Sequence, residues 1–262
     1  MGRLALMDDL MLYLIGFFPV LVRVSGLVMA APIIGGRGVP HQVRVALTFV
    51  TALLLYPSLS VPPVPSTVLS YFAVIIRELL VGLGLGFSVT LVFSAIYLAG
   101  QLIDVPMGFG MVNVVDPQSG TQVPILAQFQ YILAALIFFS VGGHHALLQA
   151  LAASFALIPI GSGLPKGSLA GVVVQIFASM FYLGVRLSLP LVAGLVLTDV
   201  ALGIIARAVP QVNVFMLEFP AKILLGLLLL LALLPGYISV LARIFGTQGE
   251  LARVLETFIA SF

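Results

Sequence analysis

Few side chains in this sequence of 262 residues are suited to acid–base, nucleophilic or metal chemistry. There is no cysteine, so thiol chemistry and thiolate metal sites are excluded. The one pair of adjacent histidines, His144 and His145, diverges on a helix and has no carboxylate within 20 residues. Catalytic patterns such as His-Glu-x-x-His and Gly-x-Ser-x-Gly are absent. We therefore expect no catalytic, metal-binding or cofactor-binding residue, no cofactor and no enzyme activity.

A second group of candidates consists of charged side chains inside apolar stretches, namely Arg23, Arg186 and Asp199. A charge at the centre of a membrane helix costs about 2.5–3.5 kcal/mol on insertion scales, so each should face protein or water. Arg186 and Asp199 are 13 positions apart, which is too far along one helix for contact. We expect them to pair with other helices or subunits, and a role in transport is the alternative.

The elements that must position these residues are strongly apolar. Hydrophobic residues make up 61% of the chain and charged residues 8%, with a mean hydropathy of +1.26. Soluble domains have about 45–50% apolar and about 25% charged residues. The composition excludes a soluble enzyme, a disordered chain and a disulfide-stapled domain. A membrane protein or a subunit of an apolar assembly remains, and the scattered basic residues do not indicate nucleic-acid binding.

Charge-free stretches bounded by glycine and proline predict an all-α fold of integral-membrane-type helical hairpins. The expected helices lie near residues 10–33, 41–60, 68–102, 124–141, 145–158, 168–207 and 212–245. We expect three consecutive parts: an N-terminal helical region (1–163), a long C-terminal hairpin (164–246) and an amphipathic tail (247–262). Apolar residues recur in the tail at three- and four-residue steps. This pattern is typical of a helix on the bilayer surface or of a docking helix for a partner.

Residues 104–122 do not fit a continuous helix, because they contain two prolines and three glycines. They are nevertheless too apolar for a solvated loop, and irregular backbone at membrane depth is tolerated only inside protein or along a cavity. Gly108 and Gly110 allow bending between the large side chains of Met107, Phe109 and Met111. The segment could seal an opening and yield when pushed. The alternative is a packed loop between helices, capped by its two aspartates, Asp104 and Asp116.

A second constellation is Arg77-Glu78, followed by Gly82 and Gly86. The glycines form a small-xxx-small pair, which lets two helices approach closely. Arg77 and Glu78 point about 100° apart on a helix, so they cannot pair with each other. They either extend to the membrane interface or bond different partners.

Six blocks of sequence, taken together, resemble the FliR family of flagellar export-gate proteins, which has counterparts in injectisomes. The block that overlaps the irregular segment reads Gly100-Gln101-Leu102-Ile103-Asp104, Met107-Gly108-Phe109, Asp116-Pro117 and Pro124. The others are Pro32 with Arg37, Pro40 and Arg44; Arg77-Glu78 with Gly82 and Gly86-Phe87; Phe138 with Gly143-His144; Ser154-Phe155 with Pro159; and Pro210-Gln211-Val212-Asn213-Val214-Phe215. The match runs in order from about residue 10 to residue 245.

The resemblance implies a subunit of a helical gate in the flagellar basal body, in the bacterial inner membrane. Two other small membrane proteins, each present in several copies, would assemble with it, and the substrate-specificity switch protein would wrap its base. Unfolded flagellar proteins would pass through the central channel. Because the family's assembly lies largely above the membrane plane, its apolar helices need not all cross lipid.

The resemblance also implies roles for particular residues. The family's loop after its third helix helps to close the channel, which makes Met107, Gly108, Phe109, Gly110 and Met111 the candidate plug. Asp104, Asp116 and Pro117 would hold the loop. Helix or subunit packing is expected at the following residues: Arg77, Glu78, Gly82, Gly86, Arg186, Asp199, Asn213 and Phe215. Soft apolar side chains can block ions by dewetting while yielding to a threaded chain.

Two other functions compete with this interpretation. A secondary transporter with broken helices would bind a small substrate at the midplane, but it should show corresponding interruptions in two related halves. Here one interruption stands out, at residues 104–122. A purely structural scaffold of the export apparatus would keep the assembly and lack the plug.

Overall fold

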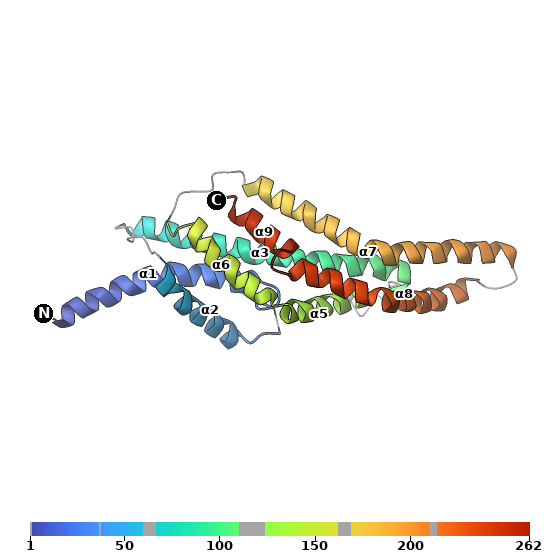
Figure 1. The fold of residues 1–262 in the computed structure, drawn as a ribbon, viewed down its shortest axis with the longest axis horizontal. Helices are drawn as coiled ribbons and strands as arrows, with labels where there is room; N and C mark the ends of the chain where they lie inside the picture. Colours follow the sequence, from blue (N-terminus) through green and yellow to red (C-terminus); the bar gives the residue numbers. More distant parts are fainter. Residues whose placement is uncertain (1, 37, 60–66, 110–123, 162–168, 210–213) are drawn as a thin grey trace. The chain divides into compact units, whose positions relative to one another are not determined.

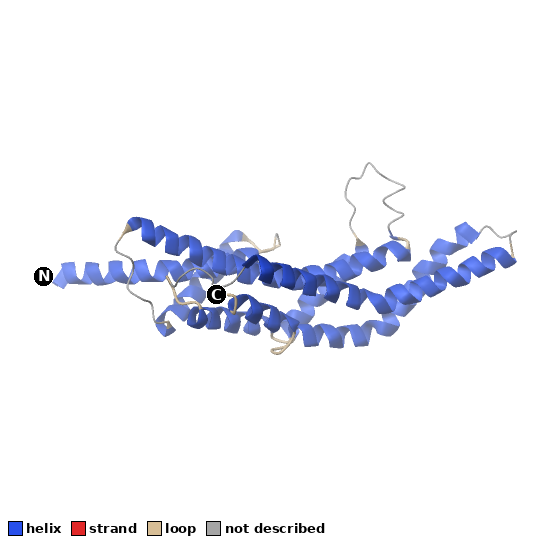
Figure 2. Cartoon of the chain, turned by 90° about the horizontal axis from the view of Figure 1, so that it is seen from above, coloured by secondary structure: helices blue, strands red, loops and turns tan. Residues whose placement is uncertain are grey.

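The computed structural model describes residues 2–36, 38–59, 67–109, 124–161, 169–209 and 214–262. These residues form helices without any strand, as Figure 2 shows, which confirms the predicted all-α class. In chain order the helices are α1 (Gly2–Ala30), α2 (His41–Leu55), the 3-10 turn η1 (Tyr56–Ser58), α3 (Val68–Met107), α5 (Ile125–Ser140), α6 (Gly143–Leu157), α7 (Leu169–Ala208), α8 (Val214–Phe245) and α9 (Glu250–Ile259). Figure 1 labels the α-helices along the ribbon.

The helices belong to two compact units that do not follow the three consecutive parts expected from the sequence. The first unit combines residues 1–91, 143–176 and 246–262, and the second combines residues 92–142 and 177–245. Both α3 and α7 therefore contribute residues to each unit. The consecutive division stays a prediction about chain organisation, whereas the compact units reflect which helices share a core.

In the first unit, α1 packs against α2, and α6 packs against α9. Its core includes Val24 of α1, Leu85 of α3 and Leu151 of α6, none of which is exposed to solvent. The apolar face of α9 is buried too, because Leu251, Leu255, Phe258 and Ile259 are at most 6% exposed. The tail is thus an intramolecular helix, and both interpretations drawn from its amphipathic pattern are wrong.

In the second unit, α5 packs against α8. Phe93, Phe138 and Phe245 form an aromatic cluster with ring centroids 5.0–5.7 Å apart. A separate aliphatic cluster joins the end of α3 to α5, α7 and α8. It contains Ile103, Met107, Leu126, Leu191, Leu195 and Leu230.

Helix α3 continues to Met107, beyond the end near residue 102 that its glycines and prolines indicated. Pro106 lies in its last turn, where it lacks the N–H that another residue would donate to the carbonyl of Leu102. Ile103 and Met107 are four residues apart, so both point into the aliphatic cluster from one face of the helix. Burial of these two side chains favours the extra turn over an earlier stop.

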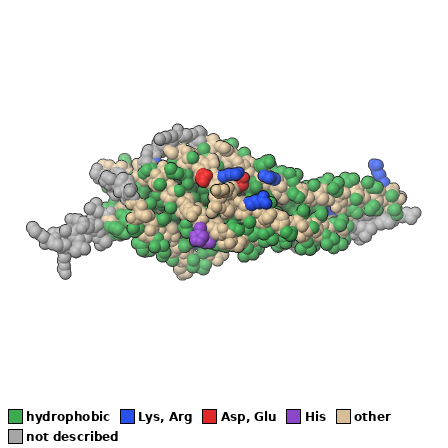
Figure 3. All heavy atoms as spheres, in the orientation of Figure 1, with side chains coloured by type: hydrophobic (Ala, Val, Ile, Leu, Met, Phe, Trp, Pro, Cys, Tyr) green, Lys and Arg blue, Asp and Glu red, His purple; other side chains and the backbone are tan. Residues whose placement is uncertain are grey.

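Large apolar side chains also remain on the surface, and Figure 3 shows hydrophobic side chains spread across the face drawn, with few charged ones. Leu54 of α2 is 74% exposed and Leu69 of α3 is 84% exposed. Four described helices are long and apolar enough to cross a membrane, or up to five if the pair α5 and α6, bent by 70°, counts as one span. Such a surface needs lipid or protein neighbours.

Candidate functional site

The candidate site is the base of the segment that leaves α3 and returns at α5. At the end of α3, Asp104 is 4% exposed and its two oxygens accept hydrogen bonds from two backbone N–H groups of α5. The N–H of Leu126 lies 3.0 Å from Oδ1, and that of Ala127 lies 3.2 Å from Oδ2. Pro124, the residue just before α5, makes no side-chain hydrogen bond that would cap this helix. Asp104 therefore caps α5 from outside that helix.

This cap is favourable for two reasons. The first N–H groups of a helix lack partners within it, and the positive end of the helix dipole attracts a carboxylate. Gly100, one turn before Asp104, makes the approach possible because a Cβ built there would overlap the backbone of Ala127. Two positions 22 residues apart in sequence, Asp104 and Leu126, are thereby joined at the base of the segment.

Met107 holds the outgoing end of the segment in the aliphatic cluster. Its side chain is fully buried. It lies against Gly226 of α8, in the space that a side chain at position 226 would otherwise occupy. A Cβ built on Gly226 would lie only 2.8–3.0 Å from Cε, Sδ and Cγ of Met107. The absence of a side chain at position 226 thus gives Met107 its space.

Gly108 then turns the chain out of the helix. Its φ of 93° lies in the left-handed region that other residues rarely adopt, and its N–H donates to the carbonyl of Val105 over 3.1 Å. A Cβ there would come within 3.2 Å of the Phe219 ring. Phe109, the next residue, packs against the aliphatic cluster.

The predicted plug residues therefore divide into two groups. Met107, Gly108 and Phe109 lie in the described part of the chain, at the base, where Met107 and Phe109 pack within their own subunit. Gly110 and Met111, together with the predicted loop-holding residues Asp116 and Pro117, lie outside the described residues. The described base contains one charged group, Asp104, and its arrangement suits mechanical support rather than bond-making chemistry.

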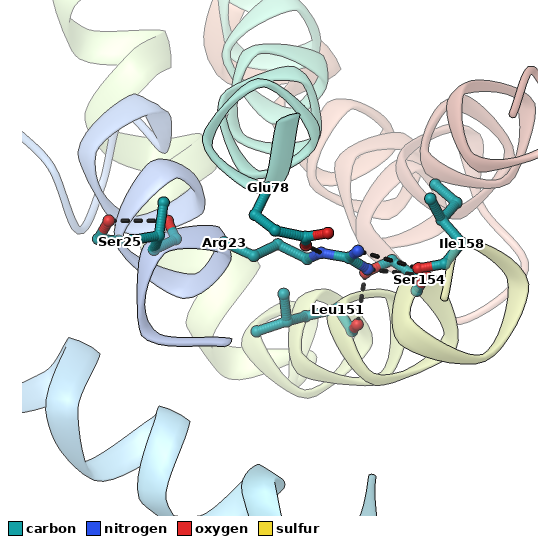
Figure 4. A network of polar contacts seen from close by, with 7 residues as sticks. Arg23, Ser25, Glu78, Leu151, Ser154 and Ile158 are labelled. Atoms are coloured by element: carbon teal, nitrogen blue, oxygen red, sulfur yellow. Dashed lines mark hydrogen bonds and ion pairs between the residues drawn. The ribbon is translucent and has the colours of Figure 1, made fainter. Parts of the chain in front are cut away.

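A buried ion pair lies in the first unit, where Arg23 of α1 meets Glu78 of α3 (Figure 4). Arg23 Nε lies 2.6 Å from Glu78 Oε2, and neither side chain is exposed. The two other guanidinium nitrogens donate to the carbonyls of Ser154 and Ile158, each over 2.9 Å, at the end of α6. The Phe155 ring lies 4.2 Å from the guanidinium carbon.

The pair joins three helices, because Arg23 also donates to two carbonyls at the end of α6, and one of these, the carbonyl of Ser154, accepts the Ile158 N–H as well. Placement of Glu78 at the membrane interface, one of the two options from sequence, is wrong because this carboxylate is fully buried. The adjacent Arg77 is only partly buried, in keeping with the expected divergence of neighbouring side chains on a helix.

Close packing of α1 against α3 depends on small residues beside this pair. A Cβ on Gly82 would overlap the backbone carbonyl of Arg23, and one on Gly86 would lie 2.6 Å from the Ala30 Cβ. A Cβ on Gly26 of α1 would come within 2.8 Å of the Leu83 nitrogen. The two helix backbones are thus nearly in contact, so larger side chains would force them apart.

In the second unit, Asp199 of α7 pairs with Lys222 of α8. Lys222 Nζ lies 2.8 Å from Asp199 Oδ1 and 2.5 Å from Glu218 Oε1, and this ion triad joins α7 to α8. Arg186, the other charge expected to pair, is exposed on α7. Asn213 and the side chain of Phe215 lie outside the described residues.

No group of three potential metal-binding side chains occurs among the residues that the structure describes. The His144 and His145 ring centroids lie 4.2 Å apart where α6 begins after the bend at Gly142. The left-handed φ of 73° at Gly142 permits that bend. The bend matches the break expected between the helices near 124–141 and 145–158, but the expected divergence of the two histidines is wrong, because their rings lie side by side.

Several residues of these sites were not identified from the sequence. The spacing of Glu218 and Lys222, four positions on a helix, is a usable signal for an ion pair. The pairing of Arg23 with Glu78 across 55 positions carries no such local signal, and neither does the contact of Gly226 with Met107. The Phe258 ring packs where a side chain on Gly84 would lie, and this contact between distant residues has no local sequence signal either.

Comparison with known proteins supports one family along most of the chain. The family model of bacterial export proteins, family 1, matches residues 14–248. The flagellar biosynthetic protein FliR of Bacillus subtilis is 35% identical over 93% of this chain and 95% of its own length. The FliR proteins of Escherichia coli and Aquifex aeolicus are 36% and 30% identical, over 84% and 92% of this chain and equal shares of their own lengths. The chain therefore belongs to the FliR family, within family 1 of the bacterial export proteins.

Proposed function

We propose that this protein is a subunit of the flagellar export gate that helps to form the channel for unfolded flagellar proteins and to plug it. The proposed plug is supported by the way in which the segment between α3 and α5 is held at its base. Its outgoing end is held by Met107 in the aliphatic cluster, and its returning end is tied to Asp104 by two hydrogen bonds. Both ends of the segment are thus held by the same structural unit.

The sequence between these ends supplies the sealing chemistry. Residues 109–115 read Phe-Gly-Met-Val-Asn-Val-Val, in which apolar side chains surround a single amide. A constriction of such side chains excludes water and so blocks ions, but it offers no strong bond to an unfolded chain that displaces it. Opening and closing a path in this manner requires no covalent step, so the function is not enzymatic.

The proposed partners are the two other small membrane subunits of the gate, present in several copies, and the substrate-specificity switch protein. Exposed apolar side chains on α2, α7 and α8 support extensive contact with such neighbours. The proposed location is the bacterial inner membrane, at the flagellar basal body. The four to five helices of sufficient length and apolarity are compatible with that location.

A test replaces residues 110–115 with glycine and serine at unchanged length, in cells that make the whole export apparatus. This change leaves Asp104, Met107 and Phe109 in place, so the base of the segment should keep its structure. We expect the complex to assemble in normal amount, while the cells become permeable to small ions and to a small dye. Dye entry and the recovery of the intact complex are measured in parallel.

The matched control makes the same replacement in residues 60–66, a segment between α2 and α3 that has no proposed sealing role. It should leave permeability unchanged. A tight, fully assembled complex after replacement of residues 110–115 would refute the plug and favour the structural scaffold. A stable lone chain that binds a small metabolite would instead favour the transporter.

A further inference from the structure

The ion triad of the second unit carries unequal numbers of opposite charges. Lys222 is the one cation between two carboxylates, Asp199 and Glu218, so the triad has a formal charge of −1. The side chain of Lys222 is 12% exposed, whereas those of Asp199 and Glu218 are 40% and 32% exposed. The cation is therefore mostly covered, and the surplus negative charge faces outward.

No other basic group of α7 or α8 is near enough to balance this charge. Arg207 is eight positions beyond Asp199, about 12 Å along the helix, and Arg186 is about 20 Å away in the other direction. On α8, the residues from 223 to 242 are uncharged. The partly exposed negative charge of the triad therefore favours a positive group from outside this hairpin.

Exposed apolar side chains and an open glycine flank the triad. Val196 precedes Asp199 by one turn and is 50% exposed, and Leu225 follows Lys222 by one turn and is 41% exposed. Gly203, one turn after Asp199, has open space within 4 Å of the position that a Cβ would take. An apolar helix can approach this face closely, with the triad as its polar contact.

We propose that the face formed by Val196, Asp199, Gly203, Glu218 and Leu225 docks an apolar helix of another export-gate subunit, which contributes one lysine or arginine to the triad. The inference rests on the proposed function, because it takes the occupant from the same assembly. Charge complementarity selects a basic side chain, and the exposed apolar residues select a helix with an otherwise apolar face. The contact fixes the register between the two subunits.

The test uses the full chain, made together with the other export-gate subunits, with a photo-crosslinking amino acid in place of Val196. Illumination of membranes should give an adduct with one other protein subunit. Mass spectrometry of the adduct should identify a peptide with a lysine or arginine within one helical turn of the crosslink. An adduct with lipid alone, an adduct with a second copy of this chain, or a peptide without a basic residue would overturn the proposal.

Substitutions at Glu218 then test the surplus charge. Glu218→Gln keeps the pair of Lys222 with Asp199 but neutralises the triad, so the yield of the adduct per chain should fall at least fivefold. Glu218→Asp keeps the charge and should retain at least half of the yield. If Glu218→Gln crosslinks like the unsubstituted chain, then a bound proton or the hairpin alone balances the triad, and the proposal fails.

Charge exchange provides a second test that does not depend on the stability of one variant. Glu218→Lys combined with substitution of the partner's basic residue by glutamate should restore the adduct that either change alone removes. Failure of the double variant to recover it would refute a direct ionic contact.

If the unsubstituted chain co-purifies with no other subunit, the proposed function itself fails. Co-purification without a basic residue at the crosslink defeats this inference only.

Discussion

The ion pair of Arg23 with Glu78 and the triad centred on Lys222 both place charges among apolar helices, but they are balanced differently. Around Arg23, one carboxylate, two backbone carbonyls and an aromatic ring surround a guanidinium that has no exposure, and the partly buried Arg77 also interacts electrostatically with Glu78. Around Lys222, two partly exposed carboxylates leave a net charge of −1. The first site serves internal packing, and the second leaves an interaction open to a neighbour.

Asp104 is a third arrangement, in which a buried carboxylate has no cation beside it in the described contacts. Its charge is instead stabilised by two backbone N–H groups at the start of α5. Burial alone therefore does not identify a functional charge in this protein. The balance of formal charges and partners around each group separates internal structural roles from a contact surface.

The largest predicted effect concerns the fully buried pair. Glu78→Gln leaves Arg23 charged in the interior without a counter-charge, and loss of one partner of a buried pair typically costs about 3–5 kcal/mol. We expect the free energy of unfolding of the first unit to fall by that amount. It is measured by denaturant titration of the detergent-purified complex, with protease resistance of residues 1–91 as the signal.

The double variant Arg23→Met with Glu78→Met is the control for this prediction. It removes both charges, so it should destabilise the protein less than Glu78→Gln alone. Equal losses of unfolding free energy in the two variants would show that the two charges do not depend on each other. The distinction between this pair and the triad would then no longer hold.

A smaller effect is expected from the contact beside the pair. Gly82→Ala places a methyl group against the Arg23 carbonyl, and overpacking of this kind typically costs about 1–3 kcal/mol. The same denaturant titration measures the loss. Gly236→Ala is the matched control, because no atom lies within 4 Å of a Cβ built there, and the higher helix propensity of alanine should leave stability unchanged or raised. Equal behaviour of the two variants would argue against close contact of α1 with α3.

The next effect concerns the cap of α5. Asp104→Ala removes both acceptors from the N–H groups of Leu126 and Ala127, and loss of a helix cap typically costs about 0.5–2 kcal/mol. Faster hydrogen exchange at these two amides is the measurement. Asp104→Asn retains one acceptor oxygen and should show a smaller increase. Unchanged exchange in the alanine variant would contradict the cap.

The smallest effect on stability is expected at the triad itself. Asp199→Asn weakens a pair that is partly exposed, and such pairs typically contribute about 0–1 kcal/mol. Unfolding of the chain should therefore change little, and about as little as with Arg253→Gln, which removes the exposed pair of Arg253 with Glu250. A loss comparable to that of Glu78→Gln would show that the triad is an internal structural element, and it would remove the distinction between the two sites.

Local signals in the sequence predicted most of the helices. Runs of apolar residues bounded by Gly35-Gly36, by the prolines 62, 63 and 65 and by Gly142-Gly143 located the helices to within a few residues at many of their ends. The exceptions were the start of α1, at Gly2 rather than near residue 10, and the ends of α2 and α3. At the end of α3, the burial of Ile103 and Met107 depends on leucines of α7 and α8 more than 80 positions away. Propensity near Pro106 could not include that tertiary contribution.

The apolar composition, the all-α class, the close-packing glycines and the family resemblance follow from the sequence alone, because composition and short-range spacing determine them. Only the tertiary structure decided which groups balance Arg23, which helix Asp104 caps and that the α9 tail packs on its own chain. The contacts of Arg23 and Asp104 join residues 22 to 135 positions apart, and the sequence contains no local signal for which distant partner a side chain will meet. The surplus charge of the triad became evident only when α7 and α8 placed Asp199 beside Lys222.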